Sequence, residues 1–102
     1  MARVLVLYNQ PADPAAFDAY YHGNHVPLAR KIPGLRGMQL SSTPPAALMG
    51  TAPYLVAELI FDSMADMQAA LSSPEGQAAA ADVPKFATAG VTILMLETHS
   101  AM

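Results

Sequence analysis

Four hydrophobic runs along the chain have the composition of β-strands. The run Val4–Tyr8 is continuously apolar and ends at turn residues, which indicates a strand buried on both faces. Residues 54–61 give the strongest strand pattern, and residues 91–98 give the last. Residues 37–42 alternate apolar and polar side chains, which predicts a weaker strand. The pattern therefore predicts four strands, of which the second is the most polar.

The first two strands are separated by a predicted helix. Asp13 provides an N-cap, and Pro14 is a proline at the first helical position. Aromatic residues then precede His25, and a proline follows it two residues later. We expect the helix to break or restart beside this histidine, and to end at Pro33-Gly34.

A second helical region is predicted between the third and fourth strands. Ser63 followed by Asp66 resembles a capping box, and apolar residues then recur at helical spacing. Ser73-Pro74 begins another short helical stretch, which is rich in alanine through Ala81. Residues 83–90 are predicted to be a connecting loop.

The predicted order of elements is β-α-β-β-α-β within a single domain, residues 1–102. With right-handed crossovers, this order gives an α+β ferredoxin-like sandwich, a four-stranded antiparallel sheet with helices on one face. In that fold the first and third strands are central and the second is an edge strand. The polarity of the predicted strands agrees with these positions.

The faces of these strands also predict an assembly. An antiparallel sheet with helices on one face normally alternates apolar and polar residues, but three of these strands are apolar on both faces. Hydrophobic residues make up 53% of the chain and charged residues 13%, against about 25% charged in typical domains. We therefore predict a homodimer in which two sheets pack face to face.

Charge and motif content exclude several classes of function. The net charge of −3 gives no reason to expect a nucleic-acid or membrane partner. There are no cysteines, and no segment has the length of a membrane span or the pattern of a signal peptide, so we predict a cytoplasmic protein. The three histidines do not have metal-ligand spacing and no glycine-rich phosphate loop is present, so no metal or other cofactor is predicted.

With these elements in place, the chain resembles the EthD family of the dimeric α/β-barrel superfamily. The resemblance extends over almost the whole chain, and its motifs are moderately specific when taken together. It is carried by Val4-Leu-Val-Leu-Tyr-Asn9, Asp13-Pro-Ala-Ala-Phe-Asp-Ala-Tyr-Tyr21, His25-Val-Pro-Leu28, Ile32-Pro-Gly-Leu35 and Ser73-Pro-Glu-Gly-Gln77.

This resemblance implies a ferredoxin-like protomer, a homodimer and a hydrophobic cleft between the sheet and the helices. Members of the superfamily act as cofactor-independent monooxygenases, lactone isomerases, and cyclases or decarboxylases of aromatic polyketides. The resemblance does not select one of these reactions, because function argued from a fold is analogy.

His25 is the leading candidate for a catalytic residue. If Asn24 caps a restarted helix, His25 lies at a helix N-terminus, whose positive end favours neutral imidazole. Neutral imidazole can accept a proton from a carbon acid or a phenol. The alternative is a histidine that hydrogen-bonds to the backbone and holds the kink.

Two tyrosines are candidates to orient a substrate oxygen. Tyr21 lies four residues before His25, so a continuous helix places both on one face. Tyr20 lies on a neighbouring face with Phe17, which we assign to the core. For either tyrosine the alternative is aromatic packing of the helix against the sheet.

Three further residues are candidates for substrate binding. Asn9 ends the first strand and can bind a substrate carbonyl; the alternative is an Asx-turn. Glu58 is the charged residue of the third strand, and the alternative to an acid/base role is an ion pair with Arg3 or Arg36. Phe86, in the predicted late loop, can form part of a lid; the alternative is a plain connecting loop.

Two functions from different classes follow from the sequence. The first is a small cofactor-independent enzyme that acts by proton transfer on a hydrophobic oxygenated substrate, aromatic, polyketide-like or a lactone. The reaction would be isomerisation, cyclisation, decarboxylation or oxygenation, as a step of a degradation pathway. The second is a non-catalytic dimeric module that binds a hydrophobic ligand or assists a partner enzyme.

Overall fold

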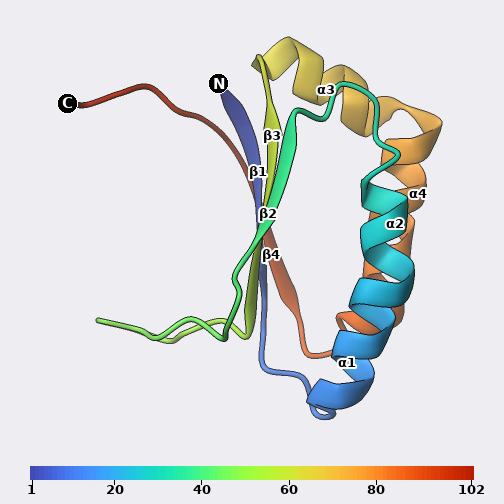
Figure 1. The fold of residues 1–102 in the computed structure, drawn as a ribbon, viewed down its shortest axis with the longest axis vertical. Coiled ribbons are helices and arrows are strands. Elements are labelled where there is room, and N and C mark those ends of the chain that lie inside the picture. The colour runs from blue at the N-terminus through green and yellow to red at the C-terminus, as the bar shows by residue number, and fades with distance from the viewer.

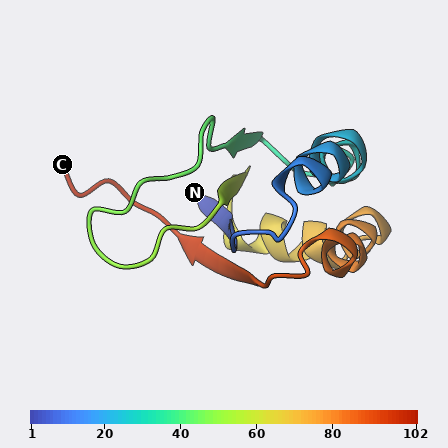
Figure 2. The same cartoon turned by 90° about the horizontal axis from the view of Figure 1, so that it is seen from below.

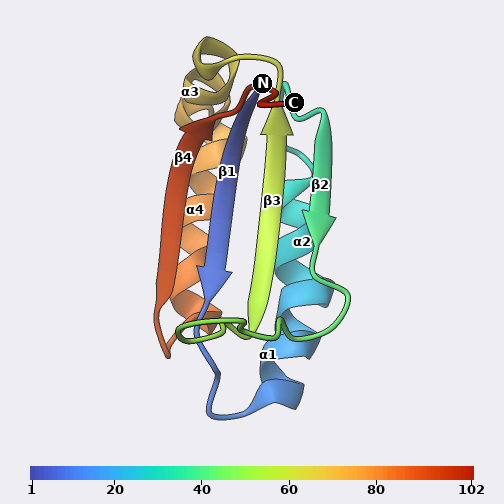
Figure 3. The same ribbon diagram turned by 90° about the vertical axis from the view of Figure 1, so that its left-hand side faces the viewer.

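Four strands form one antiparallel sheet, and the helices lie against one of its faces (Figure 1). The computed structural model describes residues 1–102. The strands are β1 (Ala2–Tyr8), β2 (Gly37–Leu40), β3 (Leu55–Phe61) and β4 (Val91–Glu97). Their order in space is β2-β3-β1-β4, so the first and third strands are central (Figure 3). This confirms the predicted α+β, ferredoxin-like fold.

Alternation along the two central strands separates the faces of the sheet. In β1 and β3 every second residue is buried beneath the helices, and the residues between them are half-buried. Antiparallel pairing aligns Val4 with Leu59 and with Met95, and it aligns Tyr8 with Val91. Residues opposite each other in an antiparallel pair point to the same face. These side chains therefore form the floor on which the helices pack.

The first helical region consists of three consecutive segments: α1 (Pro14–Tyr20), the π-helical turn η1 (Tyr21–His25) and α2 (Val26–Ala29). The Asp13 carboxylate accepts the amide of Ala16 at 3.1 Å, which confirms the predicted N-cap. The predicted restart at Asn24 is wrong. The backbone stays right-handed through η1, and the Val26 amide bonds to the carbonyl of Tyr21, five residues earlier. Such π turns are often found at functional sites.

The second helical region consists of α3 (Met64–Ser72) and α4 (Pro74–Phe86). Ser63 and Ser73 cap these helices, each accepting a backbone amide three residues later, at 3.1 and 3.0 Å. The predicted end of α4 at Ala81 is wrong, because the helix continues to Phe86 despite Pro84 in its last turn. The buried Phe86 ring holds this turn against the core, so tertiary packing outweighs the local preference of proline.

Four buried rings form an aromatic cluster that joins β1, α1, η1 and α4. It consists of Tyr8, Phe17, Tyr21 and Phe86, and every pair of ring centroids lies 5.4–5.8 Å apart. This spacing is typical of favourable aromatic pairs, which contribute about 0.5–1.5 kcal/mol each beyond their burial. The prediction that Phe17 belongs to the core is confirmed. The cluster fixes the end of β1 relative to both helical regions.

The face of the sheet away from the helices, which we call the open face, carries no helix (Figures 1 and 2). The segment between β2 and β3 and the C-terminal tail both extend past this face, at opposite ends of the strands. None of the helices has the length and hydrophobicity needed to span a membrane. The apolar side chains of the open face are half-buried or exposed: Leu5, Leu7, Val56, Ile60, Leu94 and Leu96.

Candidate functional site

A cavity of about 290 Å³ lies between the helices and the sheet, and His25 is part of its wall. The histidine is the last residue of η1, and only 6% of it is exposed. Twelve of the fourteen lining residues are hydrophobic, and none is a lysine, arginine, aspartate or glutamate. The lining residues are Val4, Val6, Tyr8, His25, Ala29, Ile32, Leu59, Leu71, Gly76, Ala79, Ala80, Val83, Ile93 and Met95.

Asp82 of α4 connects the histidine to a tyrosine of α1. One carboxylate oxygen, Oδ2, lies 3.0 Å from His25 Nδ1, and the other, Oδ1, accepts the hydroxyl of Tyr20 at 2.7 Å. Asp82 is 4% exposed, so this carboxylate is held in the interior. A buried carboxylate is stable there because both oxygens accept hydrogen bonds.

The charge state of Asp82 follows from these contacts. Burial alone would raise the pKa of Asp82, but the hydrogen bonds from Tyr20 and His25 and the nearby charge of Lys85 outweigh it and lower the pKa. The hydrogen bond to Asp82 in turn raises the pKa of Tyr20. At neutral pH the group therefore contains a carboxylate that only accepts hydrogen bonds and a phenol that donates one.

Because the carboxylate can only accept, Nδ1 of His25 must carry a proton. In the neutral ring, the lone pair then lies on Nε2. Nε2 has no hydrogen-bond partner within the chain, and it is not sealed from solvent as the Tyr21 hydroxyl is. A molecule in the cavity can therefore meet a proton acceptor held by Asp82. The prediction that a helix N-terminus governs His25 is wrong, since the carboxylate selects its tautomer.

Two tyrosines, packed edge to face, lie beside this histidine. Tyr8 lines the cavity, whereas Tyr21 lies behind it, with ring centroids 5.4 Å apart. Burial raises the pKa of Tyr8, with further contributions from Tyr21 and Asp82, and burial raises the pKa of Tyr21 to about 12. Tyr21 raises the pKa of Tyr8, whereas Tyr8 partly lowers the pKa of Tyr21. The Tyr21 hydroxyl is buried without a hydrogen-bond partner at normal bonding geometry. Both phenols stay protonated at neutral pH.

The structure brings four of the predicted site residues together. Tyr21 contacts His25 at a ring-centroid distance of 5.5 Å, but it does not line the cavity. Phe86 also contacts His25, at 4.8 Å, as part of α4 and not of a loop. Tyr20 stacks on Phe86 at 5.6 Å and reaches the histidine through Asp82.

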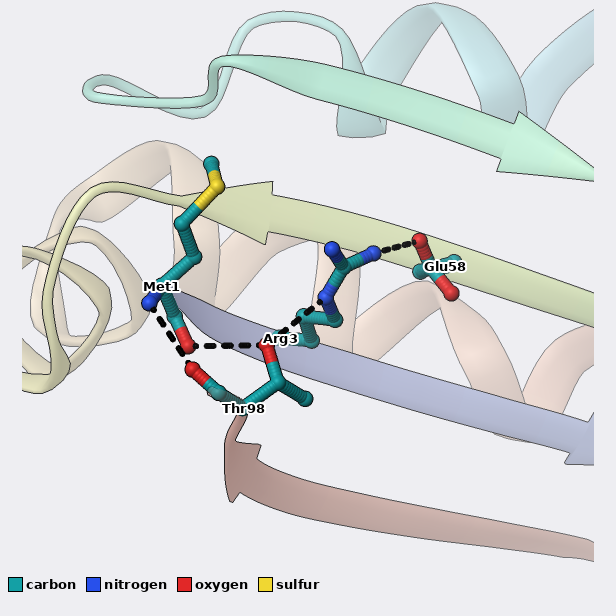
Figure 4. Close-up of polar contacts among 4 residues, drawn as sticks. All are labelled: Met1, Arg3, Glu58 and Thr98. Carbon is teal, nitrogen blue, oxygen red and sulfur yellow. Dashed lines mark hydrogen bonds and ion pairs between the residues drawn. The ribbon is translucent and has the colours of Figure 1, made fainter. Parts of the chain in front are cut away.

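Asn9 and Glu58 lie away from the cavity. The Asn9 side chain donates a hydrogen bond to the carbonyl of Ala89 at 3.1 Å and so ties the end of β1 to the turn before β4. Glu58 points to the open face and forms an ion pair with Arg3 of the neighbouring strand, which is the alternative considered for it (Figure 4). Neither side chain lines the cavity in this protomer.

The sequence analysis missed two residues of the site, Asp82 and Tyr8. Ending the helical stretch at Ala81 left Asp82 outside the predicted helix, between it and the predicted loop at residues 83–90, so no buried position was expected for it. Had the helical spacing been continued past Pro84, it would have put Asp82 on the buried face with Ala79 and Phe86. Tyr8 was taken as the end of a buried strand, and alternation alone does not show that a cavity meets its ring. No three histidine, aspartate or glutamate side chains gather as metal ligands.

The sheet order and the helices on one face define a ferredoxin-like protein, with a histidine–carboxylate pair beside an apolar cavity. Residues 9–90 match the model of the EthD domain, so the chain belongs to the EthD family. An uncharacterized 11.0 kDa protein from the thcB–thcC intergenic region of Rhodococcus erythropolis is 44% identical over 108 residues. The alignment covers 100% of this chain and 99% of that protein.

Solved structures show the same fold. An ethyl tert-butyl ether degradation (EthD) family protein from Bacillus halodurans C-125 has a TM-score of 0.88 and 36% identity, covering 97% of this chain and 99% of its own. A dimeric ferredoxin-like protein from Thermobifida fusca YX has a TM-score of 0.70 and 14% identity, covering 95% of this chain and 90% of its own. SnoaB of Streptomyces nogalater, a cofactor-independent oxygenase, has a TM-score of 0.62 and 14% identity, covering 99% of this chain and 94% of its own. The last two likenesses concern the fold alone.

Proposed function

We propose that this protein is a cofactor-independent enzyme in which His25 transfers a proton to and from a hydrophobic, oxygenated substrate. The observation that carries the proposal is the 3.0 Å contact between His25 Nδ1 and the buried Asp82 carboxylate, beside a cavity lined mainly by apolar side chains. A histidine positioned by a carboxylate is the usual arrangement of a general base.

The step we propose needs no oxidant or reductant. Nε2 of His25 removes a proton from a carbon next to a carbonyl, or from a phenol, and leaves an enolate or phenolate. The imidazolium formed stays bonded to the Asp82 carboxylate, which stabilises its charge. Return of the proton to a different carbon completes an isomerisation. General acid–base catalysis of this kind contributes about 10²–10⁴-fold.

An enolate or phenolate is also the intermediate that cyclisation, decarboxylation and oxygenation share. Oxygenation would consume dioxygen as a second substrate. Aromatic, polyketide-like and lactone substrates all fit an apolar cavity with few polar groups. The cofactor-independent oxygenase SnoaB, which shares the fold, supports the oxygenation by analogy. We place this reaction in a pathway that degrades such hydrophobic, oxygenated compounds.

We further propose that two copies of the chain pack their open faces together. Leu5, Leu94 and Leu96 lie on that face, with 46% of Leu94 exposed. A continuous apolar sheet face normally requires a covering layer, such as a second protein surface. A ferredoxin-like protein of Thermobifida fusca that shares the fold is dimeric, which supports a dimer here.

The enzyme proposal is tested with the small molecule that the purified protein retains, identified by mass spectrometry. That molecule, or a panel of aromatic ketones and lactones if none is retained, is incubated with wild type, His25→Gln and His22→Gln. His22 is exposed and serves as the control. We expect conversion by wild type and His22→Gln, and at least a hundredfold slower conversion by His25→Gln. Equal conversion by all three proteins would remove His25 from the mechanism.

The second candidate function is binding without catalysis. It is favoured by the lining itself, in which His25 and Tyr8 are the side chains that carry polar atoms. A protein that only carries a hydrophobic ligand needs no more than this. In the same experiment, a molecule that binds wild type tightly and is always recovered unchanged would establish this function in place of the first.

A further inference from the structure

We propose that the cavity binds an uncharged molecule of about two rings through a single oxygen atom, and that the Tyr8 hydroxyl donates the hydrogen bond to that oxygen. This inference rests on the proposed use of the cavity as a ligand site. It does not require that the ligand be converted, so it applies to both candidate functions.

The size of the ligand follows from the cavity. An apolar cavity of about 150 Å³ accommodates benzene, and this cavity has about 290 Å³. It extends along β1 from Tyr8 to Val4, which at about 3.3 Å per residue is roughly 13 Å. Two fused rings with one polar substituent fit these dimensions.

The charge of the ligand follows from the lining. No lysine, arginine, aspartate or glutamate lines the cavity, and His25 Nδ1 is already bonded to Asp82. A carboxylate or ammonium group that entered would lose its hydration without gaining an opposite charge beside it. The cavity therefore selects against charged ligands and accepts a neutral oxygen that needs one or two hydrogen bonds.

Tyr8 is the residue placed to donate such a bond. Its ring lines the cavity, and its hydroxyl remains protonated at neutral pH because burial raises its pKa. Behind it, the Tyr21 hydroxyl is buried without a partner. The Tyr8 oxygen can accept the Tyr21 hydroxyl while its own hydrogen is donated to a ligand, so the ligand, Tyr8 and Tyr21 can form one hydrogen-bonded chain that satisfies the buried Tyr21 hydroxyl. Tyr21, the tyrosine singled out from the sequence, then acts as a positioning residue through Tyr8.

The same geometry places the ligand oxygen near the proposed base. Tyr8 and His25 both contact Tyr21 and Phe86, with ring centroids 4.8–5.5 Å apart. At the other end of the cavity, Met95 lies opposite Val4 and is 56% exposed. The oxygen-bearing end therefore lies against Tyr8 and His25, and the rings extend toward the open edge at β4.

The test compares three probes that share one bicyclic skeleton. They are tetralin, which has no oxygen; 1-tetralone, which has one carbonyl oxygen; and tetralin-1-carboxylate, which is charged. Their affinities are measured by isothermal titration for wild type, Tyr8→Phe and Tyr54→Phe. Tyr54 is the control because its hydroxyl bonds to Asp18 and it does not line the cavity.

We expect wild type and Tyr54→Phe to bind 1-tetralone about five- to tenfold more tightly than tetralin, the effect of one neutral hydrogen bond. Tyr8→Phe should abolish this preference while its affinity for tetralin changes less than twofold. The carboxylate should bind at least tenfold more weakly than tetralin. A preference for 1-tetralone over tetralin that survives in Tyr8→Phe would overturn this inference and leave the proposed function standing. Binding of the carboxylate more tightly than tetralin would do the same. Binding of none of the probes by wild type would overturn both the inference and the proposed function.

Discussion

Replacing Asp82 with asparagine tests how the site selects the tautomer of His25. The substitution keeps the shape of the side chain but replaces a group that only accepts hydrogen bonds by an amide that also donates them. At present Tyr20 and His25 both donate to the carboxylate, at 2.7 and 3.0 Å. An amide can accept both only through its one oxygen. Where its nitrogen faces Nδ1 of His25, it favours the ring with the proton moved from Nδ1 to Nε2, and where it faces Tyr20 the hydroxyl turns to accept.

The size of the effect on stability follows from the same two contacts. A hydrogen bond to a charged group contributes about 1.5–3 kcal/mol and a neutral one about 0.5–1.5 kcal/mol. Two such bonds are weakened, so we expect Asp82→Asn to lower the free energy of unfolding by about 2 kcal/mol. A domain of this kind is stable by about 5–15 kcal/mol, so the variant stays folded.

Nitrogen NMR of the imidazole ring, recorded where the ring is neutral, reads the tautomer directly. Wild type should carry the proton on Nδ1, and Asp82→Asn should shift the population toward Nε2–H. Asp18→Asn is the matched control, because Asp18 accepts the Tyr54 hydroxyl at 2.9 and 3.0 Å on the surface. A wild-type ring protonated on Nε2, or a tautomer that Asp82→Asn leaves unchanged, would refute the reasoning.

Three further predictions follow. Tyr21→Phe should raise the free energy of unfolding by about 1 kcal/mol in denaturant titrations, because it removes a buried hydroxyl without a partner; a loss of stability would mean that the hydroxyl is satisfied. Folding lowers the pKa of Asp82. The ionised Asp82 carboxylate therefore contributes its full stabilisation of the folded protein above the pKa of aspartate in the unfolded chain, about 3.9, and this contribution is lost as pH falls toward the folded-state pKa. The stability advantage of wild type over Asp82→Asn should therefore shrink on acidification to about pH 3, and a constant difference would contradict this. Leu94→Glu on the open face should reduce the mass in solution from twice 10.7 kDa to 10.7 kDa, whereas the exposed-helix control Gln77→Glu should keep the larger mass.

Most of the fold is predictable because its signals are local. The apolar runs gave the strands, and Asp13 and Ser63 marked two helix starts with side chains that cap them in the structure. The continuous π turn that ends at His25 was not predictable, because glycine, asparagine and proline near it are typical of a helix end. Tertiary packing of Val26 and Tyr21 against the core outweighs those preferences.

The site was predictable in part for the same reason. His25 stands out in the sequence because aromatic residues precede it on one helix. Its partner Asp82 is 57 residues away, and only the packing of α4 against η1 brings the two together. Glu58, a lone charge in an apolar strand, attracted attention but pairs with Arg3. A lone charge therefore identifies a buried or paired position without showing which face of the sheet holds the site.

The central claim is that His25 exchanges protons with a molecule bound in the cavity. Proton NMR of 1-tetralone in deuterated water follows loss of the hydrogens on the carbon next to its carbonyl, and so detects enolisation without knowledge of the natural substrate. Wild type and His22→Gln should speed this exchange at least a hundredfold over His25→Gln. Exchange at the same rate in His25→Gln, or exchange by wild type no faster than in protein-free solution, would contradict the claim.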